Sequence, residues 1–330
     1  MQQSFSVLRI EPAAQCNLKC SHCPQVTNEL PRDVIEPEII ERALEELDKN
    51  TQIGTVVLYH GGEPFLHRDF LDLLRETKQR GVRTKTVTNG MVWRNDLYEG
   101  LVDLGLDEIM FSLDGLNGRQ SDAVRVGSSH LKILGNMKRL IDVRIARNSD
   151  TPEIKLSNVQ FFNPATPAED PIPQFPHWIE DGMGDHARFV KEYDTQWAMK
   201  WPGMHTDGLI FDVVPHGKKK RACSNIFDTI AVRWNGDVVA CCQDLVTFYP
   251  LGNVKKSSLQ EIFNGSPRET LLNAMLDGNP ISGCKECPAL GTSGFLVARD
   301  PEFYDAEDVA PPPPGFKVEA GDGYDKYIRL

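Results

Sequence analysis

Apolar and polar positions follow a repeated strand-then-helix pattern along the first two thirds of the chain. Over residues 36–47, apolar side chains recur at the spacing of one helix face, at Ile39, Ile40, Ala43, Leu44 and Leu47. Runs rich in β-branched residues predict strands over 7–10, 55–59, 83–87, 108–113, 154–161 and 209–214. Helical periods predict helices over 36–47, 69–80, 97–104, 130–145 and 185–197. Six such repeats predict an α/β fold, a parallel sheet curved into a partial (β/α)6 TIM-like barrel with its chemistry on the loops after the strands.

The pattern changes after residue 215. Two short strands, over 228–234 and 237–242, flank Asn235-Gly236, a dipeptide that suits a two-residue type I′ hairpin turn. Residues 258–263 and 268–276 have the period of short helices.

These segments suggest three parts. We expect a barrel over residues 1–215, a small α+β domain with the hairpin over 216–300, and a tail over 301–330. The tail contains four consecutive prolines, which favour extended chain. It either folds back over the protein or stays disordered.

Composition and charge narrow the possible functions. The 330 residues carry a formal net charge of −11 and so lack the concentrated Lys and Arg that neutralise phosphates; we expect no nucleic-acid partner. No apolar run is long enough to cross a membrane, and the N-terminus lacks the features of a signal peptide. We therefore expect a cytoplasmic protein without a membrane partner. Thiols stay reduced there, so eight cysteines clustered in two regions indicate two metal sites more than disulfides.

The first cysteine group, Cys16, Cys20 and Cys23, has the spacing C-x3-C-x2-C on the loop after the first predicted strand. Three thiolates on one loop can hold three corners of an iron–sulfur cube and leave the fourth iron open. A structural zinc site would need a fourth protein ligand, for which His22 or His60 is available. The spacing alone leaves both kinds of site open.

Three further motifs follow the next predicted strands in order. They are His60-Gly61-Gly62-Glu63-Pro64, Thr88-Asn89-Gly90 and Ser112-Leu113-Asp114-Gly115. With the cysteine loop, this ordered set resembles the radical S-adenosylmethionine (AdoMet, SAM) superfamily. The resemblance implies that Cys16, Cys20 and Cys23 bind a catalytic [4Fe-4S] cluster, whose open iron is chelated by AdoMet for reductive cleavage to a 5′-deoxyadenosyl radical. It also implies AdoMet contacts from His22, Gly61, Gly62, Glu63, Asn89, Ser112 and Asp114.

The second cysteine group comprises Cys223, Cys241, Cys284 and Cys287. Four thiolates can close either a [4Fe-4S] cube or a zinc site. The arrangement resembles the Twitch domain, the shortened SPASM extension that follows some radical SAM barrels. This resemblance implies one auxiliary [4Fe-4S] cluster.

Cys242 is left over beside Cys241. With Asn235-Gly236 as the turn, Val232 pairs with Val239 and Ile230 with Cys241. The Gly-x4-Cys spacing that starts at Gly236 matches the Twitch pattern and favours Cys241 as the ligand. Cys242 is then a buried bystander, a hydrogen-atom donor or a second-choice ligand.

The auxiliary cluster narrows the expected reaction. A closed cluster can accept an electron, which suits oxidation of an alcohol to a ketone after hydrogen abstraction. The cluster layout is similar to that of the 2-deoxy-scyllo-inosamine dehydrogenases of aminocyclitol antibiotic pathways. We expect an oxidoreductase with a small-molecule substrate of sugar, aminocyclitol or nucleoside-sugar type, and an electron donor such as flavodoxin or ferredoxin. An epimerase or decarboxylase is the alternative; a peptide maturase is disfavoured because no peptide-recognition domain precedes the barrel.

Two further groups are candidates for substrate chemistry. Lys218, Lys219, Lys220 and Arg221 form either a solvated loop or a site for a substrate phosphate or carboxylate. His60 is either a base or a conformational residue, and Cys242 is the thiol that an epimerase would use. Two non-catalytic classes stay open: a zinc-binding interaction protein that uses both cysteine groups, and an electron-transfer protein with two clusters.

Overall fold

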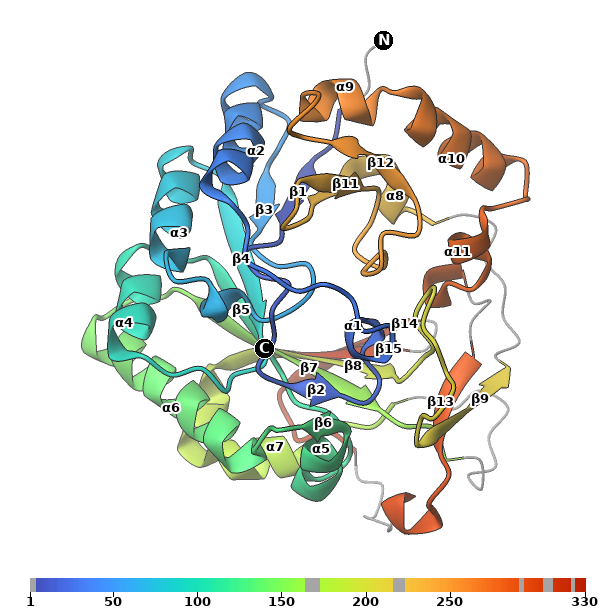
Figure 1. Ribbon diagram of the computed structural model, residues 1–330. Helices are drawn as coiled ribbons and strands as arrows, with labels where there is room; N and C mark the ends of the chain where they lie inside the picture. The colour runs from blue at the N-terminus through green and yellow to red at the C-terminus, as the bar shows by residue number, and fades with distance from the viewer. Residues whose placement is uncertain (1–3, 164–172, 216–222, 291–293, 305–310, 322–323) are drawn as a thin grey trace.

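The computed structural model describes residues 4–163, 173–215, 223–290, 294–304, 311–321 and 324–330 (Figure 1). Within these residues, parallel strands form the centre of the main sheet in the order β1 (Val7–Ile10), β3 (Thr55–Val57), β4 (Arg83–Thr88), β5 (Glu108–Ser112), β7 (Glu153–Gln160) and β8 (Val190–Trp197). Helices α2 (Pro37–Lys49), α3 (Phe70–Gln79), α4 (Asn95–Asp103), α6 (His130–Ala146) and α7 (His177–Met183) lie along its outer side in Figure 1. The predicted α/β fold is confirmed.

The main hydrophobic core lies between this sheet and its helices. Helix α2 buries Ile39, Ala43, Leu44 and Leu47, the face that the helical period predicts. Pro37 opens the helix, where a missing backbone N–H has no cost. Burying each large aliphatic side chain contributes about 1.5–3 kcal/mol, so the core fixes the strands whose ends carry the site loops.

The sixth barrel strand differs from the prediction. The helix expected over 185–197 is wrong: residues 184–189 form the 3-10 turn η2 (Gly184–Phe189), and β8 follows. Val190, Tyr193, Thr195 and Trp197 are β-branched or aromatic and suit a pleated, half-buried surface better than a helix. The strand expected over 209–214 forms as β9 (Phe211–Pro215), but it pairs antiparallel with β13 (Gly294–Ala298) outside the barrel.

The predicted hairpin forms as β10 (Thr229–Val232) and β11 (Asp237–Val239), with a register one residue away from the prediction. Val232 pairs with Val238, because Gly236 N–H donates to Arg233 O at 2.9 Å and Gly236 adopts φ +86°. The turn therefore spans three residues with glycine in the left-handed region. The ladder ends at Val239, so the expected pairing of Ile230 with Cys241 is wrong, and both Cys241 and Cys242 lie in the following loop.

The segment after residue 222 continues the main sheet. β10 pairs in parallel with β1, and β12 (Pro250–Asn253) pairs antiparallel with β11. Short helices α8 (Asn225–Asp228), α9 (Leu259–Phe263), α10 (Ser266–Leu276) and α11 (Ser282–Lys285) surround this edge, and α9 and α10 match the predicted helices. The hairpin thus lies directly beside the strand that precedes the first cysteine loop.

The C-terminal residues fold back onto the barrel. β15 (Tyr324–Arg329) pairs antiparallel with β8, and β14 (Phe316–Gly321) pairs with β15. Phe316 contacts Phe175 and Tyr193, which anchors the hairpin on the core. Of the two outcomes left open for the tail, the described residues take the folded one.

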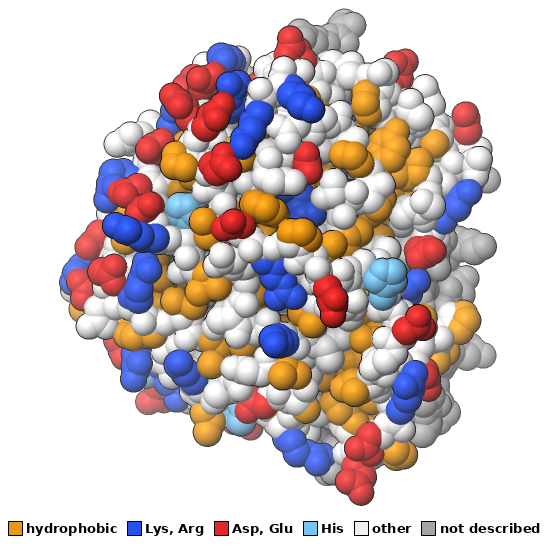
Figure 2. Space-filling view, viewed as in Figure 1, with side chains coloured by type: hydrophobic (Ala, Val, Ile, Leu, Met, Phe, Trp, Pro, Cys, Tyr) orange, Lys and Arg blue, Asp and Glu red, His pale blue; other side chains and the backbone are white. Residues whose placement is uncertain are grey.

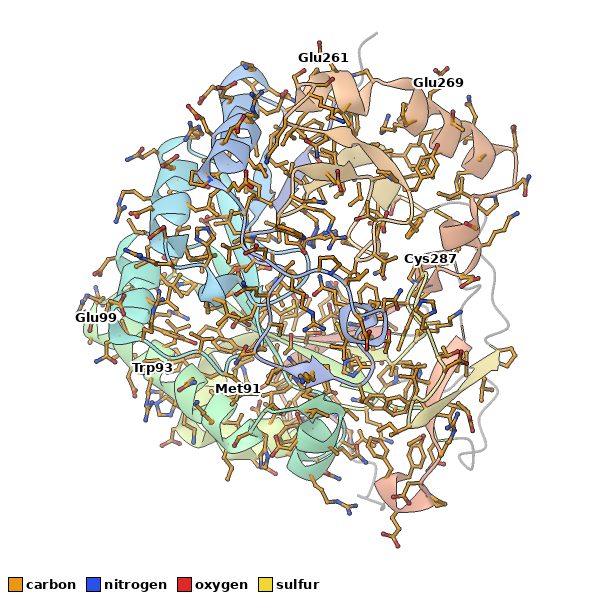
Figure 3. All side chains as sticks on the ribbon, in the orientation of Figure 1. Met91, Trp93, Glu99, Glu261, Glu269 and Cys287 are labelled. Atoms are coloured by element: carbon orange, nitrogen blue, oxygen red, sulfur yellow. The ribbon has the colours of Figure 1, made fainter. Side chains whose placement is uncertain are left out.

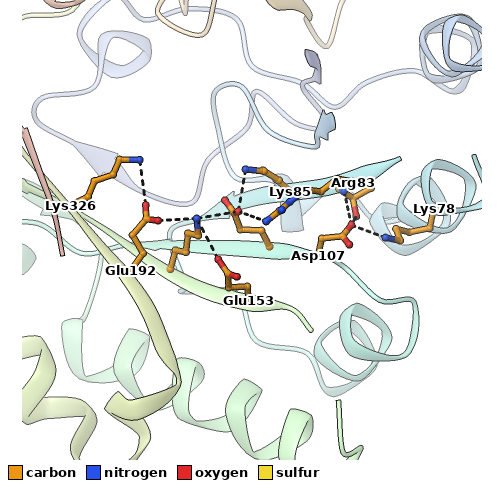
Figure 4. A network of polar contacts seen from close by, with 10 residues as sticks. Lys78, Arg83, Lys85, Asp107, Glu153, Glu192 and Lys326 are labelled. Atoms are coloured by element: carbon orange, nitrogen blue, oxygen red, sulfur yellow. Dashed lines mark hydrogen bonds and ion pairs between the residues drawn. The ribbon is translucent and has the colours of Figure 1, made fainter. Parts of the chain in front are cut away.

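A charged network occupies the barrel end where the strands begin (Figure 4). Lys155 Nζ lies 3.3 Å from Glu108 Oε2 and 3.0 Å from Glu192 Oε2, and both carboxylates are buried. Lys85 also pairs with Glu108, at 3.1 Å. These charges satisfy one another at the end opposite to the cysteine loop, which marks that end as structural.

Candidate active site

The loops after β1, β3, β4 and β5 surround an open cavity of about 740 Å³, a volume that includes its solvent-filled mouth. Its wall contains Cys16, Cys20 and Cys23 together with His22, Gly61, Gly62, Asn89 and Ser112. The cysteine loop, with β2 (Lys19–Cys20) and α1 (Pro24–Thr27), lies at the front in Figure 1. Motifs spread over a hundred residues thus converge, because loops after parallel strands share one edge of the sheet.

Hydrogen-bond donors point at the thiols of Cys16 and Cys23. Leu18 N lies 3.4 Å and Asn89 Nδ2 3.6 Å from Cys16 Sγ, and backbone N–H groups next to Cys23 donate to its thiol. Burial raises the pKa of all three thiols, that of Cys20 to about 12. Donors of this kind stabilise thiolates, so the loop fits metal-bound sulfurs that have released their protons.

Gly62 permits the closest backbone approach in the cavity wall. It adopts φ +57°, and a Cβ atom there would lie 2.3 Å from Ala13 O. Its N–H donates to Gln25 Oε1 at 3.2 Å. Any side chain at this position would collide with the chain that leads into the cysteine loop.

Glu63 lies behind the wall and not on the cavity surface. Its carboxylate is wholly buried and accepts hydrogen bonds from Asn89 N at 2.7 Å, Thr88 Oγ1 at 2.9 Å and Phe65 N at 3.2 Å. Burial raises the pKa of Glu63 to about 7, although these donors oppose the shift. In this arrangement the carboxylate holds the loop after β4 against the loop after β3.

Asp114 also lies behind the wall. It receives Arg125 Nη1 at 2.9 Å and Val159 N at 3.2 Å, and His22 Nε2 lies 3.4 Å away. Burial disfavours the charge of Arg125, but the Asp114 carboxylate together with the nearby Cys20 and Cys16 thiols outweighs it, so the pKa of Arg125 is raised. Arg125 faces the cavity, so Asp114 orients a cation there.

His60 is not on the cavity wall. His60 Nε2 lies 3.0 Å from Asp244 O, and burial lowers the pKa of His60 to about 4. Lys218, Lys219, Lys220 and Arg221 lie outside the described residues.

The second cysteine group is brought together around the loop after β11 and helix α11. Cys241, Cys284 and Cys287 are buried, and Cys223 is half-buried. Burial raises the pKa of Cys284 to about 11 and that of Cys287 to about 12, and the nearby Cys223 adds to both shifts. Cys242 also raises the pKa of Cys287, which is labelled in Figure 3. The Cys242 thiol accepts a hydrogen bond from Asn225 Nδ2 at 3.7 Å. Cys241 as the ligand stays a prediction.

Several wall residues escaped the sequence prediction: Gln25, Arg32, Tyr59, Val87, Arg125, Trp201 and Leu245. Arg125 comes from β6 (Arg125–Val126), where it pairs with Cys20. Leu245 comes from the loop after Cys242. Single residues of this kind have no local pattern, so only the tertiary arrangement identifies them.

Comparison with known proteins identifies two domains in the chain. The radical SAM superfamily profile matches residues 10–152, and the profile of SPASM, an iron–sulfur cluster-binding domain, matches residues 223–288. The chain therefore contains a radical SAM domain followed by a SPASM-type domain. The two domains imply AdoMet, a catalytic [4Fe-4S] cluster and an auxiliary [4Fe-4S] cluster, as the sequence motifs predicted.

Similarity extends over most of the chain for some relatives. The tungsten-containing aldehyde ferredoxin oxidoreductase cofactor-modifying protein of Pyrococcus furiosus is 24% identical over 89% of this chain and 90% of its own. The cysteine-type anaerobic sulfatase-maturating enzyme of Clostridium novyi is 23% identical over 91% of this chain and 90% of its own.

Solved structures share the fold at low identity. BtrN in complex with AdoMet and 2-DOIA has a TM-score of 0.55 and 15% identity, covering 93% of this chain and 99% of that chain. SuiB of Streptococcus suis bound to its precursor peptide SuiA has a TM-score of 0.57 and 15% identity, covering 88% of this chain and 71% of that chain. Among the described residues, no helix has the length and apolar content to cross a membrane.

Proposed function

We propose that this radical SAM enzyme oxidises an alcohol carbon of a small polar molecule, of sugar, aminocyclitol or nucleoside-sugar type, to a ketone. The observation that carries the proposal is the pairing of two thiol sites in one fold. Three thiols line an open cavity, and a second, mostly buried group comes from segments before and after the β10–β11 hairpin. The first suits radical generation, and the second suits removal of an electron.

In this proposal Cys16, Cys20 and Cys23 hold the catalytic cluster, and AdoMet lies against His22, Gly61, Gly62, Asn89 and Ser112. The N–H groups aimed at the thiols and the close approach at Gly62 support this assignment. Glu63 and Asp114 act from behind the wall, by holding the loop after β4 and by orienting Arg125. A guanidinium facing the cavity suits a carboxylate group.

When bound, AdoMet and the catalytic cluster supply a 5′-deoxyadenosyl radical that removes a hydrogen atom from carbon. The chain has to bind the substrate beside it and limit water. Val87, Trp201 and Leu245 give the cavity apolar walls, and Arg32 provides a cation there. The oxidation balances when the alcohol carbon loses one hydrogen atom, its hydroxyl loses a proton to water, and one electron passes to the auxiliary cluster.

Cys223, Cys241, Cys284 and Cys287 are the proposed ligands of the auxiliary cluster. Four thiolates leave no open iron, which favours electron transfer over substrate binding. Cys241→Ala should lose the auxiliary iron, whereas Cys242→Ala should keep it. The opposite result would make Cys242 the ligand and remove it as a hydrogen-atom donor.

His60 is proposed as a conformational residue of the glycine loop. Its contact with Asp244 O and its lowered pKa of about 4 support this role over that of a base. The cluster of Lys218, Lys219, Lys220 and Arg221 is proposed as an anion site. Lys219→Glu should then raise the substrate KM and leave the AdoMet KM unchanged, and an unchanged substrate KM would remove the assignment.

Deuterium tracing tests the proposed oxidation. Anaerobic enzyme, AdoMet and dithionite are incubated with a panel of polyols and aminocyclitols that carry deuterium on the alcohol carbon. Oxidation predicts one deuterium in 5′-deoxyadenosine and a ketone product. An unoxidised product that takes up deuterium from heavy water would instead establish epimerisation. Unlabelled 5′-deoxyadenosine with every compound would reject the substrate class.

Peptide modification is the second candidate function. It is favoured by the similarity to a sulfatase-maturating enzyme along nearly the whole chain and by the fold shared with SuiB. Peptides containing Cys or Ser should then stimulate 5′-deoxyadenosine formation and lose hydrogen mass. If the polyols stimulate and the peptides do not, this candidate is excluded.

A further inference from the structure

A buried polar network links the glycine loop of the cavity to the segment that carries the auxiliary thiols. Its centre is Glu11, which follows β1 and is wholly buried. Glu11 Oε1 accepts a hydrogen bond from Gly61 N at 3.1 Å. Glu11 Oε2 accepts from Arg233 Nε and Trp234 N, each at 3.1 Å. One carboxylate therefore joins the loop after β3 to the turn of the β10–β11 hairpin.

Arg233 carries the network onward to the loop after Cys242. It is buried, and its Nη1 donates to Thr247 Oγ1 at 2.6 Å. Thr247 has φ +57°, a conformation that β-branched residues rarely adopt. A strained residue of this kind persists only where its surroundings hold it in place, and the Arg233 contact does so.

His60 makes a second connection between the same two loops. Its Nε2 lies 3.0 Å from Asp244 O, and the Asp244 carboxylate accepts from Phe248 N at 2.8 Å and Tyr249 N at 3.2 Å. The residue before Gly61 is thus bonded to a loop that begins directly after Cys241 and Cys242.

The Glu11–Arg233 ion pair constrains the two loops more closely than apolar contacts would. Glu11 and Arg233 are both buried, so each leaves an uncompensated buried charge when the other is removed. Apolar contacts would bring the two loops together without fixing their relative position. Directional bonds to Gly61 N, Trp234 N and Thr247 Oγ1 fix it.

We propose that Glu11 and Arg233 are positioning residues that couple AdoMet binding at the glycine loop to the conformation of the auxiliary-cluster loop. The inference rests on the proposed function, because it takes the two thiol groups to hold the two clusters. Coupling of this kind is reciprocal, so a change at either loop alters binding or order at the other.

Hydrogen exchange on the reconstituted holoenzyme tests the coupling. In the wild type, AdoMet should slow amide exchange in the segment 243–251, which contains Phe248 and Tyr249. Glu11→Gln should abolish this AdoMet-dependent protection while keeping the auxiliary iron. The same variant should raise the AdoMet KM by about tenfold or more, as is usual for groups that orient a binding shell, with a smaller effect on kcat.

Glu192→Gln is the matched control. Glu192 is also a buried carboxylate in an ion pair, 3.0 Å from Lys155 Nζ, but it lies at the opposite barrel end. It should lower thermal stability and leave the AdoMet-dependent protection and the AdoMet KM as in the wild type. Loss of protection in this control would show that any buried ion pair matters and would overturn the proposal.

Arg233→Lys gives the same test if Glu11→Gln does not fold. It keeps the charge but loses the guanidinium geometry that joins Glu11 and Thr247, so it should also abolish the protection. Retained protection in either folded variant overturns the coupling. If the wild type forms 5′-deoxyadenosine but shows no AdoMet-dependent protection, the coupling alone fails. If the wild type forms none, the proposed function fails.

Discussion

Cys16, Cys20 and Cys23 share one loop and one open cavity, whereas the second thiol group is assembled from distant segments. Cys223, Cys241 and the α11 region with Cys284 and Cys287 meet only in the folded chain, and three of these four thiols are buried. Thiols on one loop can leave a cluster iron open to a ligand. Four thiols are enough to close a cube, which favours electron transfer over ligand binding.

The surface around the two sites differs as well. Figure 2 shows many charged side chains over helices α2 to α4, while a group of hydrophobic side chains lies at the upper right, where β12 and α10 are in Figure 1. The less charged part of this face therefore belongs to the segment that carries the second thiol group.

The substitution with the largest expected effect removes a thiol of the first site alone. Cys20→Ala should abolish 5′-deoxyadenosine formation and remove about four irons per chain, because a cube held by two thiolates is not retained. The auxiliary iron should remain. Iron analysis and chromatography of AdoMet products measure both, and a variant that still cleaves AdoMet would contradict the assignment.

Removing a thiol of the second site should stop formation of the oxidised product but not AdoMet cleavage. Cys287→Ala should lose about four irons and the oxidised product, while AdoMet cleavage continues at a reduced level. The cause is the loss of the electron acceptor and not of the radical source. Full ketone formation in this variant would rule out an electron-accepting role.

A glycine substitution tests the close backbone approach in the wall of the first site. Gly62→Ala should raise the AdoMet KM strongly, because the added Cβ collides with Ala13 O and forces the glycine loop to move. Gly81→Ala is the matched control: it also has positive φ, +72°, but open space around the new atom. It should cost about 1–2 kcal/mol of stability and leave the AdoMet KM unchanged. Equal KM values in the two variants would refute the close approach.

The substitution with the smallest expected effect on activity lies in the charged network, at the barrel end opposite to the cavity. Burial alone would raise the pKa of Glu108, but the ammonium groups of Lys155 and Lys85 outweigh it and lower this pKa below its ordinary value of 4.5. The ionised carboxylate therefore stabilises the fold above that pH, and this contribution is lost as the pH falls through the lower folded value. Lys155→Met should reduce stability by about 1–3 kcal/mol near neutral pH and weaken its decline in acid.

Thermal unfolding as a function of pH measures this effect. AdoMet cleavage per folded enzyme should not change, since the network lies away from the cavity. A loss of cleavage in the folded variant would mean that the two barrel ends are not independent.

Local spacing explains why much of the first site was predictable. The three cysteines and the glycine loop are contiguous motifs, and their convergence follows from the parallel order of the strands. Glu63 and Asp114 were predicted as AdoMet contacts, but they lie behind the wall, where Thr88, Asn89 and Arg125 bond to them. Partners from other segments have no signature in the sequence.

Weak local preferences for helix, strand or turn type explain which predicted elements were wrong. Residues 190–197 carry polar and aromatic residues that fit either a helix or a strand, and pairing with β7 and β15 decides in favour of β8. Asn235-Gly236 fits both a two-residue and a three-residue turn, and the contact of Gly236 N with Arg233 O selects the longer one. The Glu11–Arg233 pair joins residues more than two hundred positions apart, which no local pattern predicts.

Anaerobic reconstitution with iron and sulfide tests the two-site account most directly. The account predicts brown protein with about eight irons per chain, two cubes of four, that forms 5′-deoxyadenosine from AdoMet and dithionite. Cys20→Ala and Cys287→Ala should each retain about half of this iron. Colourless protein that binds zinc at both cysteine groups and leaves AdoMet intact would contradict it.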